Sequence, residues 1–400
     1  MDLSLRADSG GRGVIDALIL SHFDRDHIIG AALLVDKYMV RRVYVPYLAP
    51  TELAFVLAGQ EVQLEESYIR ELHGLATGTG TLFGVPVTMV QPGGDGNNDG
   101  PPQNPDGPRP DRDEAADVKR ELTSLQALDR QTGRPAGAVL SARSDVGLGA
   151  PGLPGTAPWV LRFWNRGLDN DLTAHLFDEL VMCEFPMAAL SEPSAVDELV
   201  DWLEVSTNRR AALQAYRSAI AAYKPAWAAE ASGQRLANLL SLCMYSGPTA
   251  AQFGVRGYEF LDSSGQDRGY ERRYWRSEDR LWHLLVGGER VGWLGTGDAP
   301  LGEPPIWADF SAHYADVLDR VLTVQVPHHG AAPTGGPKFF NPALIGAPGM
   351  SAVVSVGTTN SYGHPRAGVL KEVLAEGARL HVVTEECWLG FHEVIDLQLS

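Results

Sequence analysis

The sequence predicts a mixed α/β (α+β) fold for this chain of 400 residues. Three observations support the prediction. Strand and helix patterns alternate over about the first ninety residues, and helical spacing dominates from Asp171 to Arg235. From Leu236 onward, apolar strands again end in glycine-bounded loops that carry aspartate or histidine. A chain of this length can bury a sizeable core as one large domain or two ordinary ones.

The N-terminal part, residues 1–90, is expected to belong to the main domain. Residues 17–20 end an apolar strand, residues 28–38 have a helical pattern, and residues 42–46 form a second strand that a proline stops. The apolar run at residues 82–90 predicts a further strand. Strands and helices therefore alternate along this part as they do in α/β proteins.

The next part, residues 91–155, changes abruptly to glycine, proline, asparagine and aspartate. Such a segment buries too little apolar surface to offset its ordering entropy. We expect a low-complexity flexible loop, with at most a short helix near residues 115–128. Residues 156–235 are expected to hold one strand, Trp159–Trp164, and then a helical insertion with apolar residues at three- and four-residue steps.

The C-terminal part, residues 236–400, returns to the main domain. Strands are predicted at residues 239–245, 292–294, 321–326 and 352–356. The last three lead into loops that carry Asp298, the pair His328 and His329, and His364. Open sheets build their sites at the ends of strands, so these loops are candidate site segments.

Charge and cysteine content exclude several classes of protein. The 33 basic and 50 acidic residues give a net charge of -17, which argues against broad attraction to nucleic acid. Cys183, Cys243 and Cys387 have no metal-type spacing, so neither a disulfide framework nor a thiolate site is indicated. No apolar signal core or membrane-spanning stretch occurs, so we expect a soluble protein of the reducing cytoplasm.

Four potential metal ligands lie close together in one loop: His22, Asp24, Asp26 and His27. The loop directly follows the apolar stretch at residues 14–20. The four side chains can therefore fan out from the end of a buried strand and converge on metal ions, as imidazole and carboxylate ligands do. Taken alone, this segment could instead be a surface turn whose polar side chains are hydrogen-bonded or solvated.

Three later loops add further candidates. Asp298 follows Gly-Thr-Gly and can bridge two cations, although alone it is better explained by a surface turn. Adjacent histidines at the end of a strand cannot both point into one core. One of His328 and His329 would therefore face a site while the other orients it or contacts substrate. His364, between a glycine and a proline, is either a turn histidine or a catalytic one.

Together these residues form the inventory of a two-metal site. The ligand positions would be His22, Asp24, Asp26, His27, Asp298 and one of His328 or His329. Such a set suffices for two divalent cations about 3.5 to 4 Å apart that share Asp298 and a hydroxide. A site of this kind lowers the pKa of bound water, so it needs no serine or cysteine nucleophile.

These motifs resemble the metallo-β-lactamase superfamily, whose first metal motif is His-x-His-x-Asp-His. The sequence has His22-x-Asp24-x-Asp26-His27 in the same strand-to-loop setting. It is most similar to the competence-protein (ComEC-like) branch. That branch has a Thr/Ser-Gly-Asp loop, a Val-Pro-His-His-Gly segment, an Asn-x-Tyr-Gly-His-Pro segment and an Asn-x-x-Ser-Leu strand. The counterparts here are residues 296–298, 326–330, 360–365 and 238–242.

The resemblance implies an αββα sandwich of two mixed β-sheets flanked by helices, with the metals at one edge and the helical insertion outside the shared fold. By position, His22 and Asp24 would hold the first metal. Asp26 and His27 would hold the second metal, and Asp298 would bridge the two.

The resemblance also implies roles for the remaining residues. His329 would be the preferred ligand of the second metal, with His328 as the alternative. Asp26 and His364 are the expected catalytic residues, and His364 would contact substrate or donate a proton to the leaving group. Asp24 stands where the family usually has histidine. This harder ligand moves the expected metal from zinc toward manganese, iron or magnesium, although zinc still fits.

The beginning of the chain departs from the family pattern. The family normally has two or three strands before the metal motif, whereas only about twenty residues precede His22. We therefore expect missing N-terminal strands, or an edge completed by a partner chain or a second copy, because an exposed edge strand favours pairing. The separate histidine usual before the Asp298 motif is commonly absent from the ComEC-like branch; His73, His175 and His283 are its only candidates.

The leading hypothesis is a metal-dependent hydrolase that cleaves phosphodiester or related phosphate ester bonds with a metal-bound hydroxide. The expected substrate is a small phosphate ester, a nucleotide or single-stranded nucleic acid, and no membrane partner is expected. A thioester or lactone hydrolase of the same fold is the alternative enzyme. A catalytically silent scaffold or partner-binding module is the alternative outside enzymes.

Overall fold

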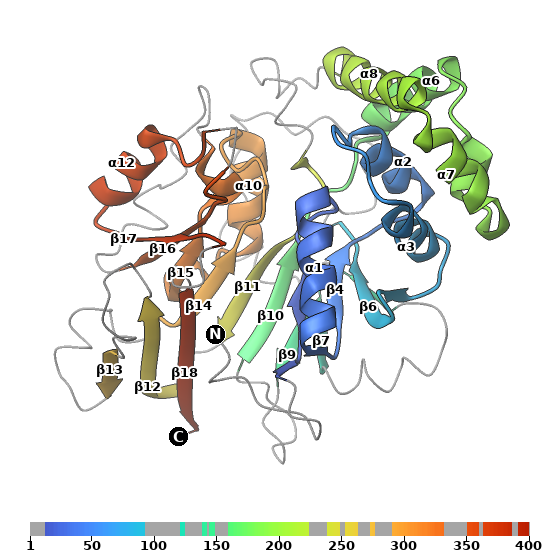
Figure 1. The fold of residues 1–400 in the computed structure, drawn as a ribbon. Helices are drawn as coiled ribbons and strands as arrows, with labels where there is room; N and C mark the ends of the chain where they lie inside the picture. Colours follow the sequence, from blue (N-terminus) through green and yellow to red (C-terminus); the bar gives the residue numbers. More distant parts are fainter. Residues whose placement is uncertain are drawn as a thin grey trace.

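Two large sheets and the helices that flank them make up this computed structural model (Figure 1). The described residues are 13–92, 121–124, 138–141, 144–148, 159–223, 238–248, 253–262, 273–276, 290–331, 350–359, 363–385 and 391–399. Strands and helices alternate at both ends of the chain, with a helical segment between them. The predicted mixed α/β fold is therefore confirmed.

The larger sheet has eight strands. They are β7 (Glu121–Ser124), β9 (Ser144–Leu148), β10 (Trp159–Trp164), β11 (Cys243–Pro248), β14 (Gly292–Gly295), β15 (Val321–Gln325), β16 (Ser351–Ser355) and β17 (Arg379–Val383). Their order is β17-β16-β15-β14-β11-β10-β9-β7. Strands β14 to β17 are parallel neighbours, so their carboxyl ends reach one edge of the sheet. β11 is antiparallel to both β14 and β10, so β11 begins and β10 ends at that same edge.

The smaller sheet has five strands. They are β2 (Leu18–Ile19), β4 (Val43–Pro46), β5 (Thr81–Leu82), β6 (Val85–Val90) and β8 (Ala138–Leu140). β2, β4 and β6 run parallel, and among the described strands β2 lies at one edge. The single strand expected at residues 82–90 is instead the hairpin β5–β6, because Phe83 and Gly84 both have positive φ angles and turn the chain.

Two small sheets complete the strand inventory. One pairs β1 (Val14–Ile15) with β3 (Met39–Val40), and the other joins β12 (Phe253–Asp262), β13 (Arg273–Arg276) and β18 (Phe391–Leu399). β12 and β18 pair along almost their whole length in antiparallel register.

Eight α-helices lie within the described residues. They are α1 (Arg25–Lys37), α2 (Pro50–Ala58), α3 (Glu66–Ala76), α6 (Asn170–Met182), α7 (Val196–Glu204), α8 (Ser206–Ala222), α10 (Pro304–His313) and α12 (Ala367–Ala375). Short 3-10 helices are η1 (Met187–Leu190), η2 (Pro193–Ala195), η4 (Leu318–Arg320) and η5 (Pro327–Gly330). None of the described helices combines the length and apolar character that a membrane crossing requires.

A small apolar cluster joins the two large sheets. Tyr44, Val90 and Leu140 come from the smaller sheet, and Leu161 and Phe163 come from the larger one. The rings of Tyr44 and Phe163 stack with their centroids 5.0 Å apart. Burying one such side chain fully contributes about 1.5 to 3 kcal/mol, so this layer holds the sheets face to face.

The range expected to be a low-complexity flexible loop, residues 91–155, contains the strands β7, β8 and β9. Residues 121–124, where a short helix was expected, are β7. In β9 the buried Asp145 binds Arg162 of β10, with 2.8 Å between Oδ2 and Nη2. A polar residue is therefore satisfied inside the sheet by a partner on the neighbouring strand, which local composition does not reveal.

The helical insertion leaves and rejoins the larger sheet at one point. β10 ends at Trp164, which pairs with Cys243 at the start of β11. The helices α6, α7 and α8 lie between these strands in sequence and pack beside α2 and α3 (Figure 1). His73 of α3 contacts the carbonyl oxygen of Ala189 in η1 through Nε2 at 2.7 Å. The insertion therefore starts from the edge that the carboxyl ends of β14, β15 and β16 also reach.

Candidate metal centre

The first ligand segment lies between β2 and the first turn of α1. His22 is buried, and Asp24 is the residue directly before α1. Asp26 and His27 lie in the first turn of α1, where an acidic residue is favoured by the helix dipole. The side chains of Asp24 and Asp26 are mostly exposed, at 59% and 71%. The strand and helix thus present two histidines inward and two carboxylates toward solvent.

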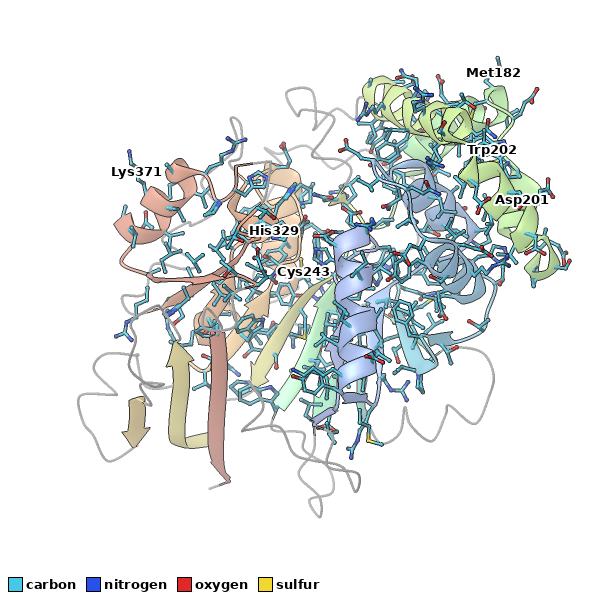
Figure 2. All side chains as sticks on the ribbon, viewed as in Figure 1. Met182, Asp201, Trp202, Cys243, His329 and Lys371 are labelled. Atoms are coloured by element: carbon cyan, nitrogen blue, oxygen red, sulfur yellow. The ribbon has the colours of Figure 1, made fainter. Side chains whose placement is uncertain are left out.

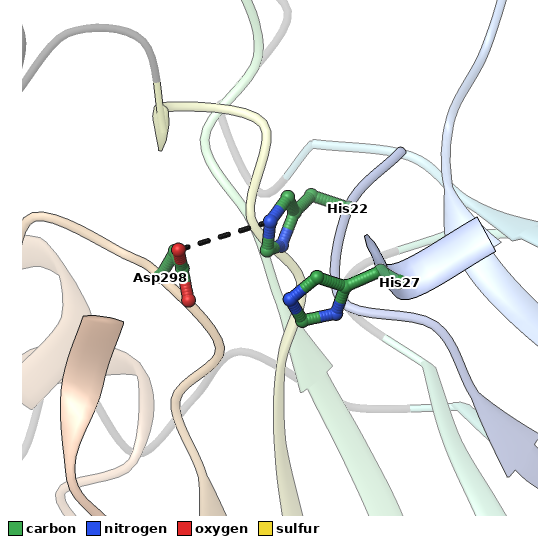
Figure 3. Close-up of side chains that lie close together, drawn as sticks. All are labelled: His22, His27 and Asp298. Carbon is green, nitrogen blue, oxygen red and sulfur yellow. Dashed lines mark ion pairs between the residues drawn. The ribbon is translucent and has the colours of Figure 1, made fainter. Parts of the chain in front are cut away.

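Asp298 from the loop after β14 meets this segment from the other sheet. Its Oδ2 lies 3.8 Å from Nε2 of His22 (Figure 3) and 3.7 Å from Nε2 of His328. Its Oδ1 lies 3.9 Å from Nε2 of His329. Figure 2 shows His329 on the edge that β14 and β15 reach. The two oxygens of one buried carboxylate therefore face histidines from different loops.

Two groups of potential ligands are compact enough to hold a cation among the described residues. The first combines His22, His27 and Asp298, and the second combines Asp26, His27 and His329. Within each group the ligand atoms lie within 4.8 Å of one another. The sequence-based assignment gave His27 to the second metal alone and let Asp298 bridge the two metals, whereas here His27 belongs to both groups and Asp298 to the first.

Asp24 belongs to neither compact group, although the resemblance made it a ligand of the first metal. Its Oδ2 lies 3.5 Å from Nε2 of His22. The Asp24 carboxylate therefore flanks His22 from the solvent side, and its assignment as a ligand stays a prediction.

Ser21 touches both histidines of the ligand segment. Its Oγ lies 2.9 Å from Nδ1 of His22 and 3.3 Å from Nδ1 of His27. A hydroxyl oxygen has two lone pairs, so it can accept from both Nδ1–H groups and leave both Nε2 atoms for a cation. Ser21 has no predicted role, because a serine before a histidine has no periodic or compositional signal.

The backbone of the second histidine pair is strained. His328 has φ 46° and His329 has φ 52°, which is the left-handed region that residues other than glycine rarely adopt. Such strain concentrates at functional sites, where surrounding contacts hold it in place. Here the amide of His328 donates to the carbonyl oxygen of Gly297 at 3.0 Å, and the amide of Ala331 donates to His328 at 2.7 Å.

Two glycines allow the loops of the site to approach each other closely. A Cβ on Gly297 would lie 2.7 Å from Cβ of Ser21, and a Cβ on Gly330 would lie 2.7 Å from Cβ of Pro365. Both glycines also have positive φ angles. Any side chain at either position would therefore push apart the loops that carry the ligands.

His364 lies beside His328, with ring centroids 5.7 Å apart. Burial, then His328 and then Arg366, lower the pKa of His364 below its ordinary value. The imidazole is therefore neutral at neutral pH, which favours its expected role as a substrate contact over that of a proton donor. Residues 360–362 of the same predicted motif lie outside the described residues.

The two histidines of the ligand segment have opposite pKa shifts. Burial alone would lower the pKa of His22, but Asp298 and then Asp24 outweigh it and raise the pKa of His22 to about 9. Burial and the positive charge of His22 lower the pKa of His27 to about 4. Desolvation would raise the pKa of Asp24, but its hydrogen bond to His22 lowers it. In the metal-free protein one proton therefore sits on His22 among the carboxylates.

The other candidate histidines lie elsewhere, and Cys243 has a structural part beside the site. His73 is buried against η1, His175 is exposed on α6, and His283 lies outside the described residues. Cys243 is buried and donates its thiol hydrogen to the carbonyl oxygen of Thr296, and burial raises the pKa of Cys243 well above its ordinary value. It therefore supports the Asp298 loop as a neutral thiol and supplies no thiolate.

The donor set fits divalent cations. Imidazole nitrogens and carboxylate oxygens are the ligands of zinc, and carboxylates also suit manganese and magnesium. Nδ1 of His329 donates to the carbonyl oxygen of Ser355 at 2.7 Å, which leaves Nε2 as the free lone pair. A second hydrogen bond that fixes the ring of a ligand in this way is typical of metal-binding histidines.

Comparison with known proteins supports this chemistry for part of the chain. Residues 2–146 match the family model of the metallo-beta-lactamase superfamily, and this range contains the ligand segment from His22 to His27. No curated protein and no solved structure matches the chain. The superfamily resemblance is thus confirmed over these residues, and it indicates a metal-dependent hydrolase, whereas the ComEC-like branch stays a prediction. The mixed α/β fold with several sheets agrees with the fold of that superfamily.

Proposed function

We propose that this chain is a metal-dependent hydrolase of phosphodiester or related phosphate ester bonds that works with two divalent cations. The observation that carries the proposal is that Asp298 belongs to the first ligand group and also faces His329 of the second. Its Oδ2 faces His22 and its Oδ1 faces His329. A carboxylate whose oxygens point toward two different groups is suited to bridge two cations, which is the arrangement that stabilises both oxygens of a displaced ester.

The division of ligands follows from the chemistry of imidazole. Nδ1 of His27 is at Ser21, so only Nε2 remains to bind a cation, and one nitrogen binds one cation. Both compact groups contain His27, and the family resemblance gives it to the second cation, so we place it there with Asp26 and His329. The first cation would then be held by His22 and Asp24, with Asp298 shared between the two. Zinc or manganese fits this mixed set, and iron or magnesium is compatible with it.

Bound divalent cations would supply Lewis acidity and lower the pKa of a water molecule, which is the chemistry that ester hydrolysis needs. The chain itself supplies orientation. Ser21 and the Ser355 carbonyl fix three histidine rings, and the buried Asp298 holds the loops in register. His364 contacts the substrate through its neutral ring. Asp26, exposed beside His27, would accept a hydrogen bond from the attacking water.

Hydrolysis of bis-p-nitrophenyl phosphate tests the proposal. Metal-stripped protein should be inactive and should recover activity on addition of Mn²⁺ or Zn²⁺. His27→Ala and Asp298→Ala should each lower kcat/KM at least about a hundredfold, because each removes a ligand. The matched controls are His175→Ala and Asp201→Ala, which change exposed residues of the insertion and should leave the rate unchanged. Figure 2 shows Asp201 on the insertion.

Other outcomes identify the alternatives. Full activity in both His27→Ala and Asp298→Ala would contradict the proposal. Turnover of a thioester or lactone without turnover of any phosphodiester would identify an acyl hydrolase of the same fold. If no metal binds and no substrate is turned over, the chain is a catalytically silent scaffold.

A further inference from the structure

The segment of residues 363–366 brings the positively charged guanidinium of Arg366 next to His364. Gly363 has φ +69°, and a Cβ at this position would lie 3.4 Å from Nη1 of Arg366. The Arg366 guanidinium therefore packs against the backbone of Gly363, the residue before His364. The amide of Arg366 donates to the carbonyl oxygen of Gly330 at 3.0 Å, which ties this segment to the histidine pair.

The charge of Arg366 is available to a ligand. The side chain is exposed, and within the described residues it forms no ion pair with a carboxylate. Its charge acts on His364, because Arg366 is one of the groups that lower the pKa of His364. By contrast, Arg162 and Arg217 are each held by a carboxylate within 3 Å.

A row of nitrogen-bearing side chains leads away from Asp298. His328 faces Asp298 at 3.7 Å, His364 lies beside His328, and Arg366 is close enough to lower the pKa of His364. This row presents N–H donors and one permanent positive charge, and no carboxylate pairs with its last member among the described residues. A substrate whose cleaved ester lies at the cations would extend along this row.

We propose that Arg366 binds a second anionic group of the substrate, next to the ester that is cleaved. The inference rests on the proposed function and narrows it to phosphodiesters that carry a neighbouring phosphate, such as a short oligonucleotide with a terminal phosphate. Guanidinium matches a phosphate through two parallel N–H···O contacts, which an ammonium group does not reproduce.

Three dinucleotides test the inference: ApA, which has only the cleavable phosphate, pApA with an added 5′-phosphate, and ApAp with an added 3′-phosphate. The wild-type protein loaded with Mn²⁺ should show a KM for pApA or ApAp that is roughly tenfold or more below the KM for ApA. Arg366→Ala should bring the three KM values together, and Arg366→Lys should retain only part of the preference.

Lys371 provides the control, because it is an exposed cation on α12, the helix that begins directly after Arg366, at the outer side of the molecule (Figure 2). Lys371→Ala should keep the preference of the wild-type protein. Equal KM values for all three substrates in the wild type, or a preference that persists in Arg366→Ala, would overturn the inference and leave the proposed function intact. Failure to hydrolyse any of the three would instead contradict the proposed function itself.

Discussion

The side-chain nitrogen of Asn238 lies 3.1 Å from Nδ1 of His328. An amide NH₂ group only donates, so Nδ1 accepts and the ring proton of His328 sits on Nε2, the atom that faces Asp298. His329 has the reverse arrangement, since its Nδ1 donates to a carbonyl oxygen. The two adjacent histidines are therefore different tautomers, and only His329 offers a free Nε2 lone pair.

This difference predicts the metal content of two variants. His329→Ala should lose about one of two bound ions per chain, whereas His328→Ala and Asn238→Ala should keep both, because the Nε2 of His328 carries a proton. Elemental analysis after equilibration with Zn²⁺ and gel filtration measures the content. Loss of metal from His328→Ala with retention in His329→Ala would reverse the two roles.

Ser21 should control metal affinity although it is not a ligand. Ser21→Ala removes the oxygen that orients His22 and His27, so we expect metal affinity to fall about 10- to 100-fold. Ser21→Thr keeps the hydroxyl and should restore most of the affinity. Competition with a chromophoric chelator measures both values, and Ser311→Ala, which removes a serine hydroxyl from α10, serves as control. Equal affinities for the alanine variant and the wild type would exclude the orienting role.

Metal binding should release a proton and strengthen with pH. Because the pKa of His22 is raised to about 9, the ring is protonated at pH 7 in the metal-free protein. A cation must displace that proton, so affinity should rise about tenfold per pH unit from pH 7 and level off above about 9. Titration calorimetry in buffers of different ionisation enthalpy counts the protons. A pH-independent affinity over this range would contradict the raised pKa.

The same pKa has a consequence for stability without metal. A group whose pKa is raised on folding stabilises the folded state. The stabilisation is complete at pH values below the pKa of the group in the unfolded chain, here 6.5. It is lost as the pH rises through the pKa of the group in the folded protein. The contribution of His22 should therefore disappear between about pH 6.5 and 9. Chemical denaturation of the metal-free proteins measures the free energy of unfolding at each pH. The His22→Ala variant should not show the decrease between about pH 6.5 and 9 that the wild-type protein shows.

His364→Ala should act mainly on substrate binding. Its lowered pKa makes it a poor proton donor at neutral pH, so we expect KM to rise about tenfold while kcat changes less. The ratio of rates for a p-nitrophenolate and an alkoxide leaving group should stay as in the wild type. A selective loss with the alkoxide would show instead that His364 protonates the leaving group.

The buried pair of Asp145 and Arg162 should matter for stability. Among the described residues, Asp145→Ala leaves the buried guanidinium of Arg162 with Asp316 alone as carboxylate partner, so the free energy of unfolding should fall by about 3 kcal/mol. The exposed pair of Glu61 and Arg217 is the control, and Glu61→Ala should cost at most about 1 kcal/mol. Urea denaturation compares the two. Similar costs would mean that burial adds nothing to the Asp145 pair.

Sequence patterns predicted the strands whose burial is evident locally. The bounds expected for Trp159–Trp164 are those of β10, and the strand expected at residues 321–326 matches β15 within one residue. β9 escaped prediction because its aspartate is neutralised by an arginine on another strand. The β5–β6 turn escaped because Phe83 occupies a positive φ angle that sequence rules assign to glycine or asparagine. There the Phe83 amide is held by the carboxylate of Glu71 at 2.8 Å.

The sequence was enough to predict which residues could be metal ligands, but not which contacts hold them in place. Strand ends marked the ligand segment, Asp298 and the histidine pair, because parallel strands bring their carboxyl ends to one edge. The contacts of Ser21, Asn238 and the Ser355 carbonyl depend on neighbours far away in sequence. Asn238 did stand out in the Asn-x-x-Ser-Leu segment, but only its contact with His328 gives it a function.

The pairing of Trp164 with Cys243 makes the whole segment between them the loop of a single β-hairpin. A hairpin loop can change length without altering the register of its strands, since the ladder fixes that register. The segment that carries helices α6 to α8 therefore leaves and re-enters the larger sheet at one rung, beside the ligand-bearing loops. Its length does not enter the strand register that holds the candidate metal centre, while its helices find their own support on α2 and α3.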